Sequence, residues 1–139
     1  MKVHRFMSDA EYEVLMAGGK LMNGTVHSDK GNKSTSVGFC FFTEDPDEAI
    51  HWLSGCCYPD WCVTLEFPAG YLNETTATYR DPKRDNLYSP AGKHKRIERK
   101  EYCTTQYDNR TAKVLCATQE YKKYADLRRG LEMLGLLKS

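Results

Sequence analysis

The sequence predicts an α+β fold in a single domain, residues 1–139, with a split, mostly antiparallel sheet, two short helices and a C-terminal amphipathic helix. Three observations lead to this prediction. Apolar runs of strand length outnumber segments with helical periodicity, two helix starts carry marked capping residues, and no repeat or linker divides the chain. A chain of 139 residues also buries about 70% of its unfolded surface, enough to fold as one unit.

The N-terminal segment is expected to form a strand and then a helix. The strand covers Lys2–Met7, and Ser8 follows as a helix N-cap with Glu11 three residues later, the spacing of a capping box. The helix is expected to run to about Ala17 and to end at the glycine pair that follows, since glycine accepts the backbone conformation of a helix C-terminus. Its predicted buried residues are Tyr12, Leu15 and Met16.

The central stretch, residues 34–67, has the clearest local pattern in the chain. A dense apolar run predicts a buried strand at Ser36–Phe42, and another predicts a strand at Trp61–Phe67. A helix is expected between them at Pro46–Ser54. Asp45 is suited to be its N-cap, proline occupies the first helical position, and Glu48 completes a second capping box. Gly55 is expected to end this helix.

The rest of the chain is expected to add strands, two surface loops and a helix. Tyr71–Tyr79 is rich in threonine and suits a short strand, and Ile97–Tyr107 and Thr111–Thr118 are expected to pair as a hairpin across Asp108–Asn109. Residues 23–33 and 81–95 are polar segments that predict loops. Apolar residues at spacings of three and four predict a helix over Gln119–Leu137.

Composition excludes several classes of protein. The net charge is +1, which disfavours attraction of the whole molecule to nucleic acid or membrane. No apolar run approaches the ~20 residues of a membrane span, and the N-terminus lacks the apolar core of a signal peptide, so we expect a cytoplasmic protein. The chain has no phosphate-binding Gly-Lys-Ser/Thr loop, no Gly-x-Gly-x-x-Gly after a strand, and nothing that marks a cysteine nucleophile.

The six cysteines are interpreted as thiols rather than as disulfides or metal ligands. A reducing compartment disfavours disulfides, and there is no Cys-x-x-Cys pair to chelate zinc. A structural zinc site stays the alternative. Four of the six fall in predicted strands, where a free cysteine behaves as a small buried apolar residue: Cys40, Cys62, Cys103 and Cys116. We therefore expect no metal.

The order of several short patches resembles the ADP-ribosyltransferase superfamily. A first strand containing His4 and Arg5 is followed by a helix ending in glycines, the patch Ser34-Thr35-Ser36, the run Gly38-Phe39-Cys40-Phe41-Phe42, and a late strand containing Glu101-Tyr102. Members of this superfamily bind NAD in a cleft of a split, strand-rich fold and cleave the bond between nicotinamide and ribose. The resemblance covers about residues 3–107.

The resemblance implies a role for each matching residue. In the arginine branch, Arg5 would hold the NAD phosphates and ribose, Ser34, Thr35 and Ser36 would support the nicotinamide pocket, and Glu101 would be the catalytic carboxylate. In the branch resembling poly-ADP-ribose polymerases, His4 would frame the nicotinamide together with the patch that contains Phe39 and Phe41. Cys40 occupies the position of that branch's tyrosine. A guanidinium suits phosphate, and a carboxylate stabilises a developing cation.

Strand alternation gives one expectation about Glu101 independently of the resemblance. Along residues 97–104, Ile97, Arg99, Glu101 and Cys103 share one face of the strand, because successive side chains point to opposite faces. Glu101 therefore shares its face with apolar residues, which favours a carboxylate that points inward and lines a cleft. The alternative is an exposed charge on a solvated strand.

A basic segment supplies the candidate surface for a macromolecular partner. Eight of the chain's 20 basic residues lie between positions 80 and 100. The proposed contacts are Arg80, Lys83, Arg84, Lys93, Lys95 and Arg96. Two functions therefore stay open. The first is an NAD-binding enzyme, either an ADP-ribosyltransferase that modifies a macromolecular target, a protein being favoured over nucleic acid, or an NAD glycohydrolase that releases nicotinamide by hydrolysis. The second is a non-enzymatic binding module or inhibitor that acts through this segment.

Overall fold

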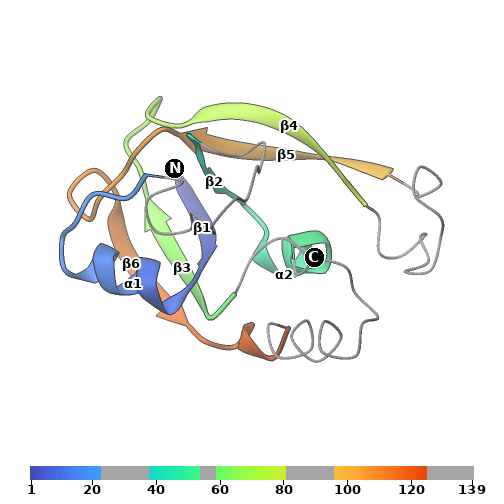
Figure 1. The fold of residues 1–139 in the computed structure, drawn as a ribbon. Coiled ribbons are helices and arrows are strands. Elements are labelled where there is room, and N and C mark those ends of the chain that lie inside the picture. Colours follow the sequence, from blue (N-terminus) through green and yellow to red (C-terminus); the bar gives the residue numbers. More distant parts are fainter. Residues whose placement is uncertain (23–37, 54–58, 81–95, 125–139) are drawn as a thin grey trace.

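The computed structural model describes residues 1–22, 38–53, 59–80 and 96–124. These residues form six strands and two helices (Figure 1). In chain order the elements are β1 (Lys2–Met7), α1 (Asp9–Met16), β2 (Cys40–Phe42), α2 (Pro46–Leu53), β3 (Trp61–Glu66), β4 (Asn73–Arg80), β5 (Arg96–Thr104) and β6 (Lys113–Thr118). The predicted loops at 23–33 and 81–95, Gly55, and the predicted C-terminal helix beyond residue 124 lie outside the described residues.

The strands form two antiparallel sheets, one in the order β1-β3-β6 and the other in the order β2-β5-β4. Figure 1 shows the long β4–β5 pair across the top of the molecule and β1, β3 and β6 below it. A bridge between His4 and Thr43 joins the two sheets where β2 ends, and each backbone N–H donates to the other's carbonyl. The predicted α+β class and the split, antiparallel arrangement are confirmed for the part of the chain that the structure describes.

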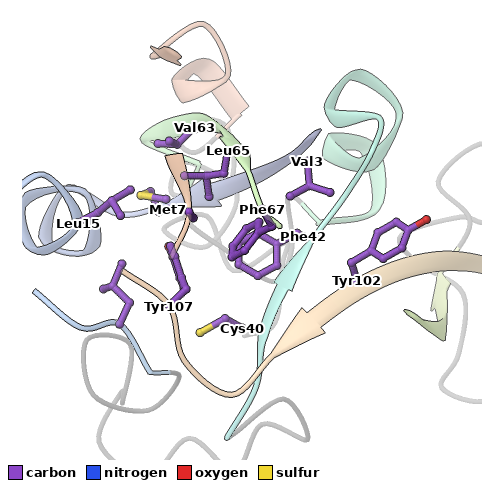
Figure 2. Close-up of a cluster of buried hydrophobic side chains, with 12 residues drawn as sticks. Val3, Met7, Leu15, Cys40, Phe42, Val63, Leu65, Phe67, Tyr102 and Tyr107 are labelled. Carbon is purple, nitrogen blue, oxygen red and sulfur yellow. The ribbon is translucent and has the colours of Figure 1, made fainter. Parts of the chain in front are cut away.

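The main core lies between the two sheets and α1. Figure 2 shows Phe42, Phe67 and Tyr107 at its centre, with ring centroids of Phe42 and Phe67 5.0 Å apart. A smaller cluster lies on the opposite face of β1-β3-β6, where the sheet packs against α2 and Tyr121. It consists of Phe6, Ala49, Ile50, Cys62 and Tyr121. Each sheet face near β1 is therefore covered by a different helix, α1 on one side and α2 on the other.

Both predicted helix starts are confirmed by their capping bonds. The Ser8 hydroxyl accepts from the Glu11 N–H, and the Asp45 carboxylate accepts from the Glu48 N–H. The end of α1 is also as predicted, because Gly18 adopts a positive φ of 84° and the two glycine N–H groups bond back to carbonyls in the last turn. The Glu11 side chain, however, accepts hydrogen bonds from Arg5.

The predicted hairpin of residues 97–107 and 111–118 is wrong. β5 pairs with β2 and β4, whereas β6 pairs with β3 in the other sheet. The chain leaves the β2-β5-β4 sheet after Thr104, and Tyr107 then exchanges backbone hydrogen bonds with Leu21. Asp108, expected in a tight hairpin turn, instead accepts from the Arg110 and Thr111 N–H groups, which together with the Thr111 side chain lower its pKa.

Three smaller expectations also need correction. β2 begins at Cys40, so Gly38 and Phe39 precede the strand that was expected to include them; Gly38 adopts a φ of +94°, which breaks the extended run, and Ser36 and Val37 lie outside the described residues. Met16 lies on the outer side of α1 with 51% of its surface exposed. Cys116 is exposed on β6, whereas Cys40, Cys62 and Cys103 are buried thiols as predicted. In the described part of the chain, neither helix has the length or the apolar character to cross a membrane.

Candidate functional site

Arg5, one of the predicted site residues, forms a buried ion pair with Glu11. Its Nε and Nη2 atoms donate to the Glu11 carboxylate at distances of 2.8–3.2 Å, and the exposed fractions of the two side chains are 10% and 2%. Burial by itself would lower the pKa of Arg5, but the adjacent Glu11 carboxylate outweighs it and raises that pKa. Arg5 therefore remains charged inside the protein.

The remaining contacts of Arg5 tie β1 to β2. Its Nη1 donates to the Phe41 carbonyl at 2.8 Å, and its Cζ lies 5.6 Å from the centroid of the Phe42 ring, a distance at which a cation attracts an aromatic face. The side chain thus connects β1, α1 and β2 in the core. The Tyr107 hydroxyl is buried in this region, and among the described residues it has no hydrogen-bond partner.

His4 points to the opposite face of β1 from Arg5, because neighbouring residues of a strand alternate. Its Nδ1 forms a hydrogen bond with the Thr64 hydroxyl at 2.9 Å, and burial lowers its pKa, with help from the positive charge of Lys2. The structure therefore does not bring His4 and Arg5 to one site. Each is part of the packing of a different side of the β1-β3-β6 sheet.

Glu101 is buried on β5, with 5% of its surface exposed, as the alternation of the strand predicted. Its neighbour on the same face is Cys103, whose pKa is raised by burial and by the Glu101 charge. Cys103 is the backbone partner of Phe41, so the Phe41 side chain lies on this face too, and the Phe39 ring lies 6.5 Å from the Phe41 ring. Three predicted site residues, Phe39, Phe41 and Glu101, are therefore brought to one face of β2-β5-β4.

Arg5 and Glu101 are not brought together. Arg5 lies against Phe42, and the Phe42 partner on β5 is Tyr102, which belongs to the core face of the β2-β5-β4 sheet. Glu101 precedes Tyr102 and so points to the opposite, outer face. We call the face that carries Phe41, Glu101 and Cys103 the outer face of β2-β5-β4.

The register of the sheet arranges the outer face in rows. Phe41, Cys103 and Asn73 form a first row across the three strands. The second row pairs Glu101 with Thr75, and the third pairs Arg99 with Ala77. The rows follow one another at roughly 7 Å, two residues of strand. An aromatic ring, a carboxylate with a hydroxyl, and a guanidinium therefore succeed one another along the face.

A cavity of about 190 Å³ lies where β2 ends, between the start of α2 and β5. It is lined by Thr43, Glu44, Asp45, Glu48, Arg99 and Lys100. The Arg99 Nη2 atom donates to Glu48 at 2.6 Å, and Lys100 Nζ lies 3.1 Å from Glu74 and 3.7 Å from Glu44. The alternation of β5 places Arg99 on the Glu101 face, but the sequence carries no signal that Glu48 is its partner, because the two residues are 51 positions apart.

The remaining predicted site residues are described only in part. Ser34, Thr35 and Ser36, like Lys83, Arg84, Lys93 and Lys95, lie outside the described residues. Arg80 and Arg96 are backbone partners at one end of the β4–β5 ladder. Within the described part of the basic segment, both Arg99 and Lys100 are paired with carboxylates, which reduces their attraction for an acidic partner.

Comparisons of the chain with models of protein families, with curated proteins and with solved structures found no match in any of the three. The site is therefore defined by its own geometry. Among the described residues, no three histidine, cysteine, aspartate or glutamate side chains are grouped so that they could hold a metal ion.

Proposed function

We propose that this protein is an NAD-binding domain of the ADP-ribosyltransferase type, which cleaves the bond between nicotinamide and ribose and transfers ADP-ribose to a macromolecular target. The observation that carries the proposal is the outer face of β2-β5-β4, where the buried Glu101 shares one surface with the Phe39 and Phe41 rings. A face with aromatic rings beside a carboxylate has the groups that a nucleoside requires.

The chemistry assigned to each group follows from its type. The Phe41 ring offers a stacking surface for the pyridine ring of NAD, and Phe39 extends that surface toward solvent. Glu101 would accept a hydrogen bond from a ribose hydroxyl. Because it is shielded from water, its charge would interact strongly with the positive charge that develops on the ribose as the bond breaks.

The reaction balances without a further co-reactant. The bond between the ribose C1′ carbon and the nicotinamide nitrogen breaks, and its electron pair leaves with nicotinamide, which becomes neutral. A nucleophilic oxygen or nitrogen of the target, or of water, then bonds to C1′ and loses its proton to the solvent. The stabilisation of the cationic ribose by Glu101 lowers the barrier of the first step.

Nicotinamide release by the wild type and by Glu101→Gln tests the proposal. We expect the wild type to bind NAD and to release nicotinamide, and the variant to lose at least ~100-fold in kcat, the usual effect of removing a group that stabilises transition-state charge. Glu98→Gln is the matched control, because Glu98 is exposed on the same strand. Turnover that survives Glu101→Gln, or NAD that does not bind, would refute the enzymatic assignment.

A binding measurement on the same two proteins, the wild type and Glu101→Gln, distinguishes the non-enzymatic alternative. A binding module that uses the basic segment would bind a macromolecule with an affinity that falls steeply as salt rises, and that affinity would not respond to Glu101→Gln. NAD binding without nicotinamide release would indicate a domain that recognises the dinucleotide but does not cleave it.

A further inference from the structure

We infer that β4 is an interface at which two copies of this protein join their sheets edge to edge. Within the described residues β4 is paired with β5 alone and ends the β2-β5-β4 sheet, and Figure 1 shows it along the upper margin of the molecule. The backbone N–H and C=O groups on the far side of such a strand form a template to which another strand can be added. The inference goes beyond the proposed function, because it involves neither NAD nor the outer face of the sheet.

The two sheets have four outer strands among the described residues, and three of them carry features that discourage pairing with another chain. β2 is only three residues long. The edge of β1 is occupied at its centre, where His4 and Thr43 exchange backbone hydrogen bonds. The register of β6 shifts between Thr64 and Leu65, and such a bulge twists an edge strand away from a flat partner. Natural proteins use these features against association through sheet edges.

β4 differs from the other three outer strands in each of these respects. It has eight residues, and all eight pair with β5 in continuous register, without a bulge. Its sequence contains neither proline nor lysine, the residues that most often protect an edge. Glu74, Thr76 and Thr78 are exposed along it. The only charged residues of the strand, Glu74 and Arg80, are of opposite sign and lie near its two ends.

The sequence of β4 is complementary to itself in an antiparallel pair. A two-fold axis through Ala77, perpendicular to the sheet, places Glu74 opposite position 80 of the second copy, because both positions are three residues from the axis. By symmetry a glutamate is opposite an arginine twice, and opposite charges on adjacent strands attract. Thr76 is opposite Thr78, a favourable pair on an exposed face, and the small Ala77 meets its own copy at the axis.

The same symmetry limits the assembly to two copies. Each chain offers one β4 edge, and both edges are used in the dimer, so the joined sheet ends at the short β2 on either side. A single pair of strands buries less surface than a standard protein–protein interface. We therefore expect a reversible dimer with a dissociation constant on the order of 100 µM.

Sedimentation equilibrium of the wild type and of two charge-reversal variants tests the inference. Glu74→Arg and Arg80→Glu each place like charges opposite one another twice, so each should weaken dimerisation at least ~10-fold. An equimolar mixture of the two variants should recover the affinity of the wild type within ~3-fold, because both pairs in the mixed dimer are again oppositely charged. Recovery also shows that both variants are folded, so the loss in each single variant is not a loss of structure.

Glu98→Arg is the matched control. Glu98 is exposed on the same face as Glu74, but it lies on β5, opposite Thr78 and one strand away from the edge. The same reversal of charge at this position should change dimerisation less than ~3-fold. Glu74→Arg also removes the ion pair with Lys100, but both side chains of that pair are more than half exposed, so the fold should lose little stability.

Three results would each overturn the inference. The first is a wild type that remains monomeric up to about 1 mM, the weak end of specific affinities. The second is self-association that neither charge reversal weakens, which would place the contact on another surface. The third is a mixture of the two variants that associates no better than either variant alone, since a pairing of positions 74 and 80 requires the mixture to recover.

Discussion

Replacement of Glu11 by glutamine should destabilise the protein far more than the removal of an exposed carboxylate. The substitution preserves the volume of the side chain but leaves the Arg5 charge in the core, where only 10% of that side chain is exposed. Three hydrogen bonds from Arg5 Nε and Nη2 currently end on the Glu11 carboxylate. Breaking one partner of a buried ion pair typically costs about 3–5 kcal/mol, because the other charge is left uncompensated.

A matched control separates burial from charge. Glu74 forms an ion pair with Lys100 at 3.1 Å, but the two side chains are 59% and 53% exposed. Glu74→Gln should therefore cost between 0 and about 1 kcal/mol. Because a small domain is stable by only about 5–15 kcal/mol, the loss expected for Glu11→Gln is a large part of the total.

Urea unfolding followed by circular dichroism measures both variants. The midpoint should shift strongly for Glu11→Gln with an unchanged slope, which indicates a change in stability rather than in the unfolded state. A loss below about 1 kcal/mol for Glu11→Gln would refute the reasoning. The double variant Arg5→Met with Glu11→Leu provides a further check, since replacement of both charges by apolar residues should recover much of the loss.

Three further predictions concern buried groups. The pKa of His4 is lowered, so the folded protein favours the neutral imidazole, and the unfolding free energy should fall as the pH drops below the ordinary pKa of about 6.5. Urea titrations at pH 5 and pH 8 measure this loss, which His4→Gln should remove. Tyr107→Phe removes a buried hydroxyl that has no hydrogen-bond partner among the described residues, so the unfolding free energy should stay unchanged or rise. Tyr102→Phe is the comparison: it loses the hydrogen bond from the hydroxyl to the Glu44 carboxylate and should cost about 1–3 kcal/mol. Brief alkylation at pH 8, followed by peptide mapping, should find the exposed Cys116 labelled before Cys62, since burial raises the pKa of the Cys62 thiol to about 12. Equal labelling of the two thiols would contradict the packing of β3.

The features that the sequence predicted correctly depend on neighbours within a few positions. The capping bonds at Ser8 and Asp45 join residues three apart, and the left-handed glycine after α1 follows its helix directly. The burial of Glu101 followed from the alternation of its own strand. Each of these signals involves only residues that are close in sequence, and the tertiary fold did not override them.

The predictions that were wrong, or that the sequence could not make, concern contacts between residues of different elements. An alternating strand pattern shows which side chains face inward but not which strand is its neighbour, so β5 and β6 were paired because they are consecutive. Likewise, an arginine on a first strand has no local signal that its partner will be a glutamate on the following helix. The spacing from Arg5 to Glu11 crosses the boundary between a strand and a helix, where no single periodicity applies.

This contrast also explains why the candidate site is on the outer face of β2-β5-β4 rather than around Arg5. The resemblance to ADP-ribosyltransferases assigned roles by order along the chain, and it therefore combined residues from both faces of two strands. Strand alternation and pairing place Phe41 and Glu101 on one face, and the Phe39 ring lies beside the Phe41 ring. By the same two criteria Arg99 starts from this face, although its side chain pairs with Glu48 on α2. The proposed function predicts that a substitution at Glu101 affects ligand binding directly, whereas a substitution at Arg5 affects it only through the stability of the core, because Arg5 is paired with Glu11.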